Sequence, residues 1–220
     1  MENIIGIYKP KGPTSHDIVD HVRKITGIKK VGHAGTLDPL AQGILVVGIG
    51  RDATKKLSTI VQKEKEYIAK IFLGEKSTTD DDEGEKIKYE IKKIPTLEDI
   101  ENALKKHIGK IKQIPPQFSA IKVKGKAAYA SARQGKKIEL APREVEIKNI
   151  KIIKYSFPFL VIHVTTGSGV YIRALARDIG DILSCGGYLS SLERTRVGEF
   201  TKENSYTLET FAKMQNLKNK

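Results

Sequence analysis

Hydrophobic positions along the chain follow two different periods. Apolar residues that alternate or run together predict short strands, and the most continuous run, Gly43–Ile49, predicts a buried one. The other predicted strands are Asn3–Lys9, Glu66–Gly74, Glu146–Tyr155 and Phe159–Thr165. The polar stretch Asp80–Glu85 indicates a hairpin loop or an exposed insertion.

Apolar residues three and four positions apart predict four helices. Their expected first residues are Thr14, Thr96, Ile172 and Leu208, and the Ile172 helix has the strongest pattern. Asp17 and Asp99 complete capping-box patterns in the first two helices, while Gly27 and Gly109 are natural stops for them. With no internal repeat and no long linker, these elements predict one α+β domain, a mixed sheet with helices packed on it.

Length and composition narrow the class of protein. A chain of 220 residues, 39% hydrophobic and 30% charged, is long enough to form a globular core. The N-terminus lacks the features of a signal peptide, and no apolar stretch approaches the roughly 18 residues of a membrane span. A cytoplasmic protein is therefore expected. The single cysteine, Cys185, excludes an internal disulfide and fits a reducing compartment.

The charge is strongly positive and unevenly placed. A net charge of +13 favours a polyanionic partner over a neutral metabolite or an acidic protein tail. No acid occurs between Glu101 and Glu139, whereas basic residues accumulate there. Together with Pro115, Pro116 and several glycines, this composition predicts a basic excursion from the core at about 111–142. Phosphate contact is favoured over the alternative, a solvated lysine surface of a heat-adapted protein, because that surface would need acids nearby.

Two short motifs suggest a bound ligand, but each has a simpler interpretation. Gly48–Ala53 satisfies part of a dinucleotide fingerprint, yet the residues after it do not continue as a Rossmann unit, so a plain strand-end turn is favoured. Thr79–Gly84 resembles a calcium loop, but Thr79 stands where the first aspartate ligand belongs. No His/Cys cluster is present. We therefore expect neither a metal nor a cofactor.

Asp38 has the most chemistry-like setting, in the glycine-bounded loop Gly32–Pro39. Two interpretations remain open, because Asp followed by Pro commonly opens a helix, whereas an acid in such a loop can also act in catalysis. Tyr67 is either an ordinary strand aromatic or a stacking platform for a base. Arg173 is either a helix-surface charge or a residue that holds a carboxylate ionised.

Five motifs, in order, resemble those of the bacterial tRNA pseudouridine 55 synthase family, often called TruB. The motifs are Lys9–Ser15, Gly32–Ala41, Lys65–Tyr67 with Leu73–Gly74 and Thr78–Asp80, Pro115–Ala120 with Tyr129 and Ala132–Gly135, and Tyr171–Gly180. The similarity runs from about Asn3 to about Phe200. Since all five occur in the family's order, the resemblance is more specific than any single motif.

The resemblance implies an isomerase on a mixed, mainly antiparallel sheet of the pseudouridine synthase type. It makes Asp38 the catalytic aspartate, Tyr67 the aromatic residue against the target base, and Arg173 the ion-pair partner of Asp38. The reaction breaks the bond from N1 of uracil to C1′ of ribose and joins C5 to C1′, without cofactor or metal. Asp38 either attacks C1′ or assists departure of the base while Tyr67 takes a proton from C2′.

The resemblance also implies how RNA is held. His33 helps to hold the flipped-out RNA, and Tyr171 and Leu192 complete the uridine pocket. The basic excursion corresponds to the family's RNA-gripping insertion, whose RNA-binding residues are Lys122, Lys124, Lys126 and Arg133. The implied substrate is the T-arm stem-loop of tRNA, with uridine 55 extruded from its loop and bound by a monomer.

Two departures from the family's pattern affect RNA binding. Thr165–Val170 stands where the family usually carries a Cys-Ser-Lys-Gly-Thr-like run. Family members usually continue into a C-terminal RNA-binding PUA domain, whereas we expect a catalytic domain at 1–205 and only a helix with a basic tail at 206–220. An RNA-folding factor that uses the same fold without the chemistry remains an alternative function.

Overall fold

The protein is represented by a computed structural model, which describes residues 3–119, 121–123, 126–128 and 138–218. Contacts between residues divide the chain into two compact units. The first unit is Met1–Ile68 with Leu192–Lys220, and the second unit is Ala69–Ser191. Two strands, β4 (Lys65–Leu73) and β12 (Gly187–Val197), contribute residues to both units.

The first unit is built around the strand β3 (Ala41–Ile49). β1 (Ile4–Lys9) and β2 (Val31–Ala34) pair with β3 in antiparallel orientation, and β12 pairs with it in parallel through Leu192–Arg194. The other elements are α1 (Ser15–Thr26), α2 (Arg51–Val61), β13 (Phe200–Thr201) and α6 (Leu208–Lys218). The strands predicted at Asn3–Lys9 and Gly43–Ile49 and the helix from Leu208 are confirmed.

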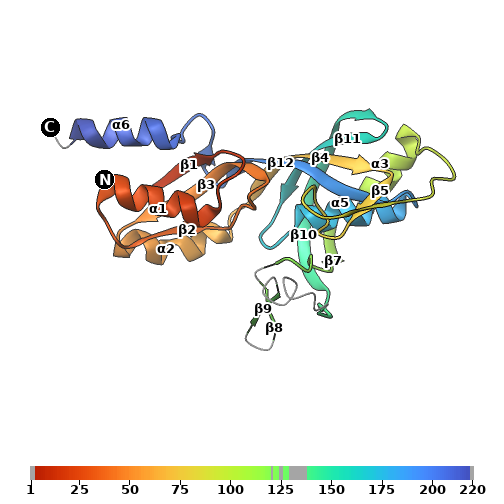
Figure 1. The fold of residues 1–220 in the computed structure, drawn as a ribbon, viewed down its shortest axis with the longest axis horizontal. Coiled ribbons are helices and arrows are strands. Elements are labelled where there is room, and N and C mark those ends of the chain that lie inside the picture. The colour runs from red at the N-terminus through yellow and green to blue at the C-terminus, as the bar shows by residue number, and fades with distance from the viewer. Residues whose placement is uncertain (1–2, 120, 124–125, 129–137, 219–220) are drawn as a thin grey trace. The chain divides into compact units, whose positions relative to one another are not determined.

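Both faces of β3 are covered, which explains its continuous apolar run. Leu45 and Val47 belong to a core cluster with residues of α1 and with Phe211 of α6, whereas Ile44 and Val46 pack with residues of α2. Figure 1 shows these helices around the strands of this unit. The first unit is therefore a helix–sheet–helix sandwich.

The ends of α1 follow its sequence signals, whereas α2 was not predicted. The side chain of Thr14 accepts a hydrogen bond from the Asp17 backbone N–H, and Gly27 ends α1 in the left-handed conformation at φ 69°. The strand does end at Ile49 and turns at Gly50, where φ is +90°, but the helix α2, which begins at Arg51 and buries one apolar side, was not expected. The apolar residues of this helix do have helical spacing. The glycines before it, however, led to a comparison with a nucleotide motif, and the helix was not considered.

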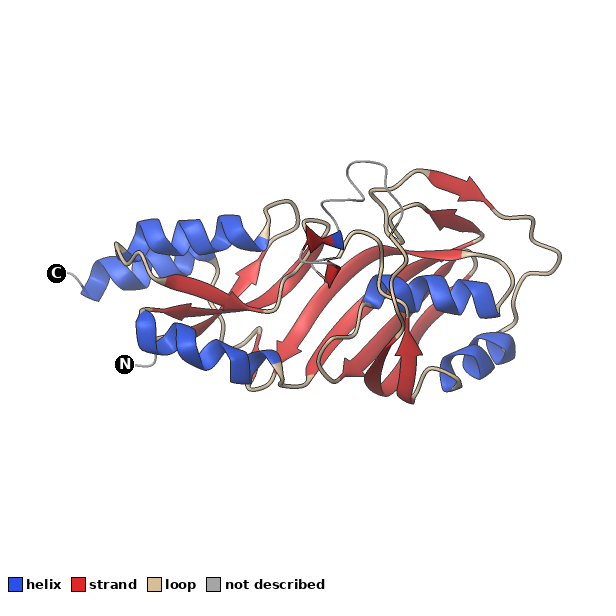
Figure 2. Ribbon diagram, turned by 90° about the horizontal axis from the view of Figure 1, so that it is seen from below, coloured by secondary structure: helices blue, strands red, loops and turns tan. Residues whose placement is uncertain are grey.

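The second unit contains β10 (Arg143–Ser156), the longest strand among the described residues. It pairs in antiparallel orientation with both β11 (Phe159–Thr166) and β7 (Gly109–Gln113). The other elements are β5 (Glu75–Ser77), β6 (Lys86–Lys88), α3 (Leu97–Lys105), β8 (Lys122–Val123), β9 (Lys126–Ala127) and α5 (Ile172–Ile182). Figure 2 shows α3 and α5, two of the blue helices, on the same side of the long strands of this unit. The predicted α+β class with a mainly antiparallel sheet is confirmed.

Most predicted elements of this unit are confirmed, with three corrections. The loop Asp80–Glu85 does connect two paired strands, β5 and β6. However, α3 ends at Lys105, not at Gly109, which has φ +96° and begins β7. Residues 111–113 belong to β7, so the start of the predicted excursion from the core is part of the sheet. The strand β12 was not predicted.

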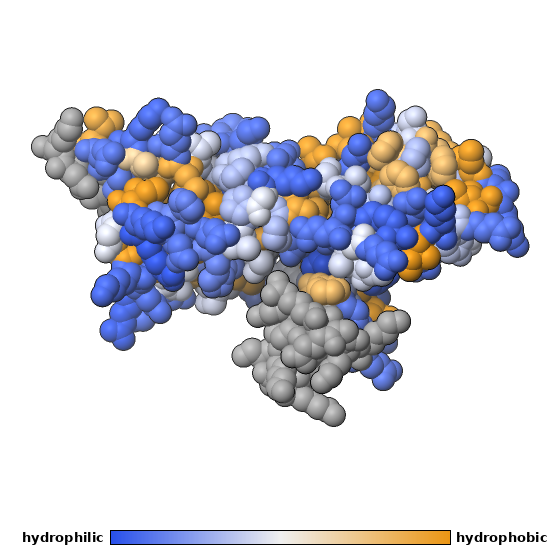
Figure 3. Space-filling model, viewed as in Figure 1, coloured by the Kyte–Doolittle hydropathy of each residue, from blue (hydrophilic) through white to orange (hydrophobic). Residues whose placement is uncertain are grey.

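The second unit exposes several large apolar residues, including Phe159 and Ile153. Phe159 of β11 is 38% exposed, and the Lys70 Nζ lies 3.9 Å from its ring centroid. Figure 3 shows that hydrophilic residues prevail on the viewed surface, with apolar residues gathered in patches. In the described part of the chain, no helix is long and apolar enough to cross a membrane.

Candidate active site

Asp38 is half-buried in the loop between β2 and β3. Pro39 and Leu40 form a turn, which is closed by a hydrogen bond of 3.0 Å from the Ala41 N–H to the Asp38 carbonyl oxygen. Ala41 then begins β3. The interpretation of Asp38 as a helix cap is therefore wrong, because a turn and a strand come after it.

Arg194, near the end of β12, is the buried cation beside Asp38. It is 2% exposed, and its Nε donates to the Ile44 carbonyl oxygen at 2.7 Å. Burial lowers the pKa of Arg194, while a hydrogen bond to the Tyr67 side chain and the negative charge of Asp38 act in the opposite direction. The Arg194 guanidinium thus interacts with two of the predicted site residues: it forms a hydrogen bond with Tyr67, and its charge attracts that of Asp38.

Sequence reasoning did not single out Arg194. It ends the run Ser191–Arg194, in which only Leu192 was given a role. The close approach of β3 to β12 depends on Gly43, where φ is +113° and a Cβ atom would lie 2.2 Å from the Arg194 carbonyl oxygen. The glycine at position 43 is the sequence signal that could have indicated a close backbone contact there, although it does not identify Arg194 as the partner.

Two further cations are buried in the first unit. The Lys9 Nζ donates to the Ala41 carbonyl oxygen at 2.7 Å, and burial lowers the pKa of Lys9 to about 8, although Asp38 raises it. The Lys65 Nζ donates to the carbonyl oxygens of Val61 and Lys63, each at 2.7 Å, and burial lowers its pKa to about 8 as well. Lys9 and Arg194 therefore both place positive potential on Asp38.

Tyr67 and His33 have buried, polar surroundings in the same unit. Tyr67 is 6% exposed on β4, and its hydroxyl contacts Arg194, which an ordinary strand aromatic would not require. The His33 ring lies edge-on to His16, with ring centroids 5.8 Å apart. Burial, followed by the charges of His16 and Arg194, lowers the pKa of His33, so the neutral imidazole is favoured.

Arg173 lies in the second unit and is only 6% exposed, so its interpretation as a helix-surface charge is wrong. Its Nη1 lies 3.5 Å from the Asp81 Oδ2, and its Nη2 donates to the Phe118 carbonyl oxygen at 2.9 Å. The neighbouring Arg177 forms an ion pair of 2.7 Å with Asp80. The predicted ion pair of Arg173 with Asp38 stays a prediction, since the two residues belong to different units.

Two carboxylates of the calcium-like loop have arginine partners. Asp80 and Asp81 are held by Arg177 and Arg173, and the Asp81 Oδ1 also accepts from the Glu83 backbone N–H at 3.0 Å. The flanking elements are the strands β5 and β6, unlike the helices of an EF-hand. The loop is better described as a charge-paired hairpin than as a cation site.

Tyr171 and Leu192, the two predicted pocket residues, are placed by their backbones. The Gln113 side chain donates to the Tyr171 carbonyl oxygen at 3.1 Å and accepts from the Tyr171 N–H at 2.9 Å. Gln113 is 1% exposed, so this pair of hydrogen bonds fixes the residue directly before α5. Leu192 lies opposite Ala41 in the parallel pairing of β12 with β3. Their uridine-binding role stays a prediction.

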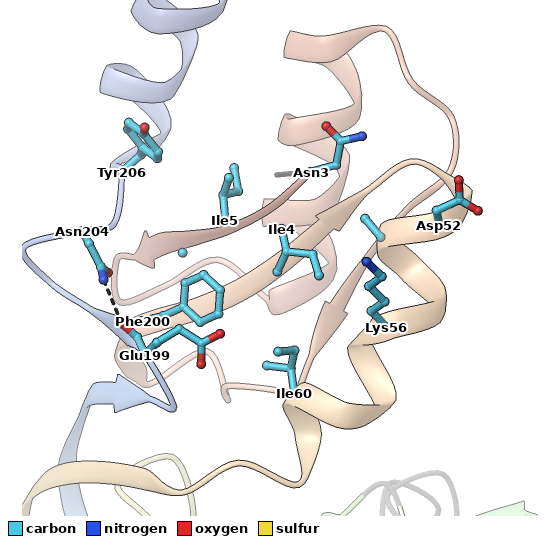
Figure 4. Close-up of a pocket in the computed structure, with 12 residues that line it drawn as sticks. Asn3, Ile4, Ile5, Asp52, Lys56, Ile60, Glu199, Phe200, Asn204 and Tyr206 are labelled. Atoms are coloured by element: carbon cyan, nitrogen blue, oxygen red, sulfur yellow. Dashed lines mark hydrogen bonds between the residues drawn. The ribbon is translucent and has the colours of Figure 1, made fainter. Parts of the chain in front are cut away.

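A cavity of about 740 Å³ lies elsewhere on the first unit. Figure 4 shows its lining residues, which come from β1, from α2 and from the segment 199–206. None of the predicted site residues lines it, and its polar side chains include Asp52, Lys56 and Glu199 without a dominant charge. The chemistry-bearing residues are therefore not gathered in this cavity.

Comparison with known families decides the identity of the fold. Residues 23–172 match the model of the TruB family pseudouridylate synthase N-terminal domain, and residues 173–220 match that of the tRNA pseudouridylate synthase B C-terminal domain. The chain belongs to the TruB family. Gly32–Ala41 with Asp38 lies inside the first match, so Asp38 belongs to the matched region and also has a cationic setting.

Relatives and solved structures extend the TruB match over nearly the whole chain. The chain is 45% identical over 210 residues to tRNA pseudouridine synthase B of Caldanaerobacter subterraneus subsp. tengcongensis, covering 95% of this chain and 73% of the relative. It is 44% identical over 204 residues to the protein of that name from Protochlamydia amoebophila, covering 93% and 77%. A crystal structure of a Cbf5–Nop10–Gar1 complex is similar with TM-score 0.75 and 29% identity over 96% of this chain, which spans 54% of that chain.

The four predicted RNA-binding residues lie in the basic excursion, at and beside the residues that the structure does not describe. Lys124 and Arg133 lie outside the described residues, as do the side chains of Lys122 and Lys126, whose backbones form β8 and β9. Their role in RNA binding stays a prediction.

Proposed function

We propose that this chain isomerises uridine to pseudouridine at position 55 in the T-arm loop of tRNA. The observation that carries the proposal is Asp38, in a TruB motif, beside a buried guanidinium that also contacts Tyr67. The reaction breaks the N1–C1′ bond, forms the C5–C1′ bond, releases the proton of C5 and leaves N1 to take up a proton. It is redox-neutral, and side chains of this chain can supply its acid–base steps.

Asp38 is the centre of the proposed chemistry. Its carboxylate either attacks C1′ to form a covalent ester or stabilises the departing base while Tyr67 removes a proton from C2′. In the second route, the hydrogen bond between the Arg194 guanidinium and the Tyr67 side chain holds the Tyr67 oxygen in place. Both routes require the anionic carboxylate, and the charges of Lys9 and Arg194 interact with it.

The remaining site residues are proposed for RNA binding and positioning. His33, Tyr171 and Leu192 hold the extruded uridine, because a base at a reacting glycosidic bond must leave its stack. Arg173 is proposed to pair with the Asp38 carboxylate in the substrate complex. The proposed phosphate-binding residues are Lys122, Lys124, Lys126 and Arg133. We further propose that the enzyme acts as a monomer in the cytoplasm, where its tRNA substrate occurs.

The substitution Asp38→Asn tests the proposal most directly. Tritium released from C5-labelled uridine in a tRNA transcript measures the reaction, and filter binding measures RNA affinity. We expect the rate of tritium release to fall on the order of 10³-fold or more. We expect the Kd for tRNA to change little, since one buried acid contributes little to phosphate contact.

Asp52→Asn is the matched control, because Asp52 is an exposed aspartate in the first turn of α2. This variant should release tritium at the wild-type rate. Full release by Asp38→Asn would remove Asp38 from the chemistry. A wild-type protein that binds tRNA but releases no tritium would favour the RNA-folding factor.

A further inference from the structure

The loop that carries Asp38 is held by its carbonyl groups. Five consecutive carbonyl oxygens, from Gly35 to Pro39, each accept a hydrogen bond. The donors are Arg194 Nη2 to Gly35 at 3.0 Å, Arg194 Nη1 to Thr36 at 3.4 Å, Ser15 Oγ to Leu37 at 2.9 Å, Ala41 N to Asp38 at 3.0 Å and Gly12 N to Pro39 at 2.8 Å. Residues 36–40 belong to no helix or strand, so these bonds take the place of a regular ladder.

Ser15 makes the most specific of these contacts. Its Oγ donates to the Leu37 carbonyl oxygen and accepts from the Leu37 N–H at 2.8 Å, so a single hydroxyl satisfies both backbone groups of the residue before Asp38. Gly12 contacts Pro39, the residue after Asp38. The segment 12–15 therefore holds both neighbours of the aspartate.

Ser15 stands on a rigid platform. It is the first residue of α1, whose start is fixed by the Thr14–Asp17 capping box. Ile18, Val19 and Val22 of the same helix are buried in the core of the first unit. Ser15 itself is 2% exposed, so water does not compete for its hydroxyl.

We propose that Ser15 is a positioning residue for Asp38, an inference that rests on the proposed function. Its hydroxyl fixes the backbone of Leu37 and thereby the direction in which the Asp38 carboxylate points. Removing the hydroxyl leaves the Leu37 N–H and carbonyl oxygen without a partner in a buried place, and the loop relieves this cost by moving. Displacement of a reacting group by about 1 Å lowers a rate strongly without weakening contacts elsewhere in the substrate.

The test compares Ser15→Ala with Ser15→Thr and Thr14→Ala. Single-turnover tritium release is measured with saturating enzyme, together with the Kd for tRNA and the melting temperature of each variant. Ser15→Ala should lower the single-turnover rate roughly 10- to 100-fold with a Kd within about threefold of wild type. Ser15→Thr, which keeps the hydroxyl, should restore most of the rate.

Thr14→Ala is the matched control on the adjacent residue. It removes the cap that the Thr14 side chain provides to the Asp17 N–H, and so weakens the start of α1 without touching Leu37. The wild-type rate is expected for this variant at a temperature well below melting. An equal loss of rate in Thr14→Ala would show that α1 stability, not Leu37 positioning, is responsible.

Two further results keep the inference separable from the proposed function. If Ser15→Ala does not fold, Ser15→Cys replaces it, since a thiol is a weaker hydrogen-bonding group; an intermediate rate supports the inference and a wild-type rate overturns it. Asp38→Asn inactive with Ser15→Ala fully active would overturn only the role of Ser15. Asp38→Asn fully active would overturn the proposed function itself.

Discussion

The two units of the chain bury arginines in different ways. In the first unit, Arg194 donates to the carbonyl oxygens of Ile44, Gly35 and Thr36. In the second unit, Arg173 and Arg177 contact the carboxylates of an acidic hairpin. Carbonyl oxygens satisfy the N–H groups of a guanidinium without cancelling its net charge, whereas carboxylates do both. The first arrangement leaves a positive field at the predicted catalytic loop, and the second neutralises a loop.

This difference assigns separate tasks to similar side chains. A guanidinium that keeps its charge in a buried place can stabilise negative charge that develops during a reaction. An ion pair at a hairpin mainly holds two segments together. Substitutions of Arg194 should therefore change the rate, whereas substitutions of the Arg177–Asp80 pair in the second unit should change mainly the stability.

Among substitutions that compare the charged groups of the two units, the largest effect is expected for Arg194→Met. The single-turnover rate should fall on the order of 10²-fold or more, because the donors to Tyr67 and to the loop are lost together. The free energy of unfolding, measured in urea, should fall by about 3 kcal/mol, since several buried carbonyl oxygens lose their donor. Arg194→Lys keeps the charge without the planar fork and should lie between wild type and Arg194→Met. A wild-type rate in Arg194→Met would show that the charge of Arg194 does not act on the reaction, and the contrast between the two units would then be wrong.

A smaller effect is expected for the ion pair of Arg177 with Asp80. Burial raises the pKa of Asp80 in spite of Arg177, so the attraction does not fully offset desolvation. A double-mutant cycle with Arg177→Met and Asp80→Asn should give a coupling energy of roughly 1 kcal/mol in unfolding. The rate of tritium release should stay within about threefold of wild type at temperatures below melting. If the rate collapsed while stability was unchanged, the pair would belong to the chemistry.

The smallest effect is expected in the pH dependence of the free energy of unfolding, where Lys65 of the first unit is compared with Lys76 of the second. Burial lowers the pKa of Lys65 from 10.5 to about 8, so from pH 8 to 10 the unfolded chain holds a proton that the folded chain releases. The Lys65 contribution to the free energy of unfolding therefore rises with pH across this window, on the order of 1 kcal/mol. Urea unfolding at pH 8, 9 and 10 should show that Lys65→Met lacks this rise.

Lys76→Met provides the control from the second unit. Its hydrogen bond to Asp181 raises the pKa of Lys76 above 10.5, so this lysine stays protonated in both states from pH 8 to 10. The unfolding curves of Lys76→Met and wild type should therefore run parallel in this window. Parallel curves for Lys65→Met as well would contradict the assignment of the slope to Lys65.

Local signals predicted the features that local physics determines. The start of α1 is predictable from Thr14 and Asp17, because a capping box is made within four residues. The strand β3 is predictable from its apolar run. Asp38 stood out because glycines and a proline mark its loop, although its neighbours could not exclude a helix cap. Family resemblance, not periodicity, raised it to a catalytic candidate.

Contacts between segments far apart in the sequence could not be predicted from local patterns. Arg194 contacts the carbonyl oxygens of Gly35 and Ile44, which precede it by 159 and 150 residues. Such a contact depends on the register of β12 with β3, and β12 itself was not predicted. Helical periodicity places Arg173 on the polar side of its helix, so a surface charge was one of its two open interpretations, yet Asp81 of the hairpin contacts it.

The short strand β7 has a consequence for how copies of this protein meet one another. It ends the sheet of the second unit, pairing with β10 on one side. β7 is only five residues long and carries the exposed Lys110 and Lys112. It ends at Gln113, whose side-chain amide donates a hydrogen bond to the Tyr171 carbonyl oxygen. Short edges that bear lysines repel a second strand. This edge is therefore protected against intermolecular sheet growth and the aggregation that such growth causes.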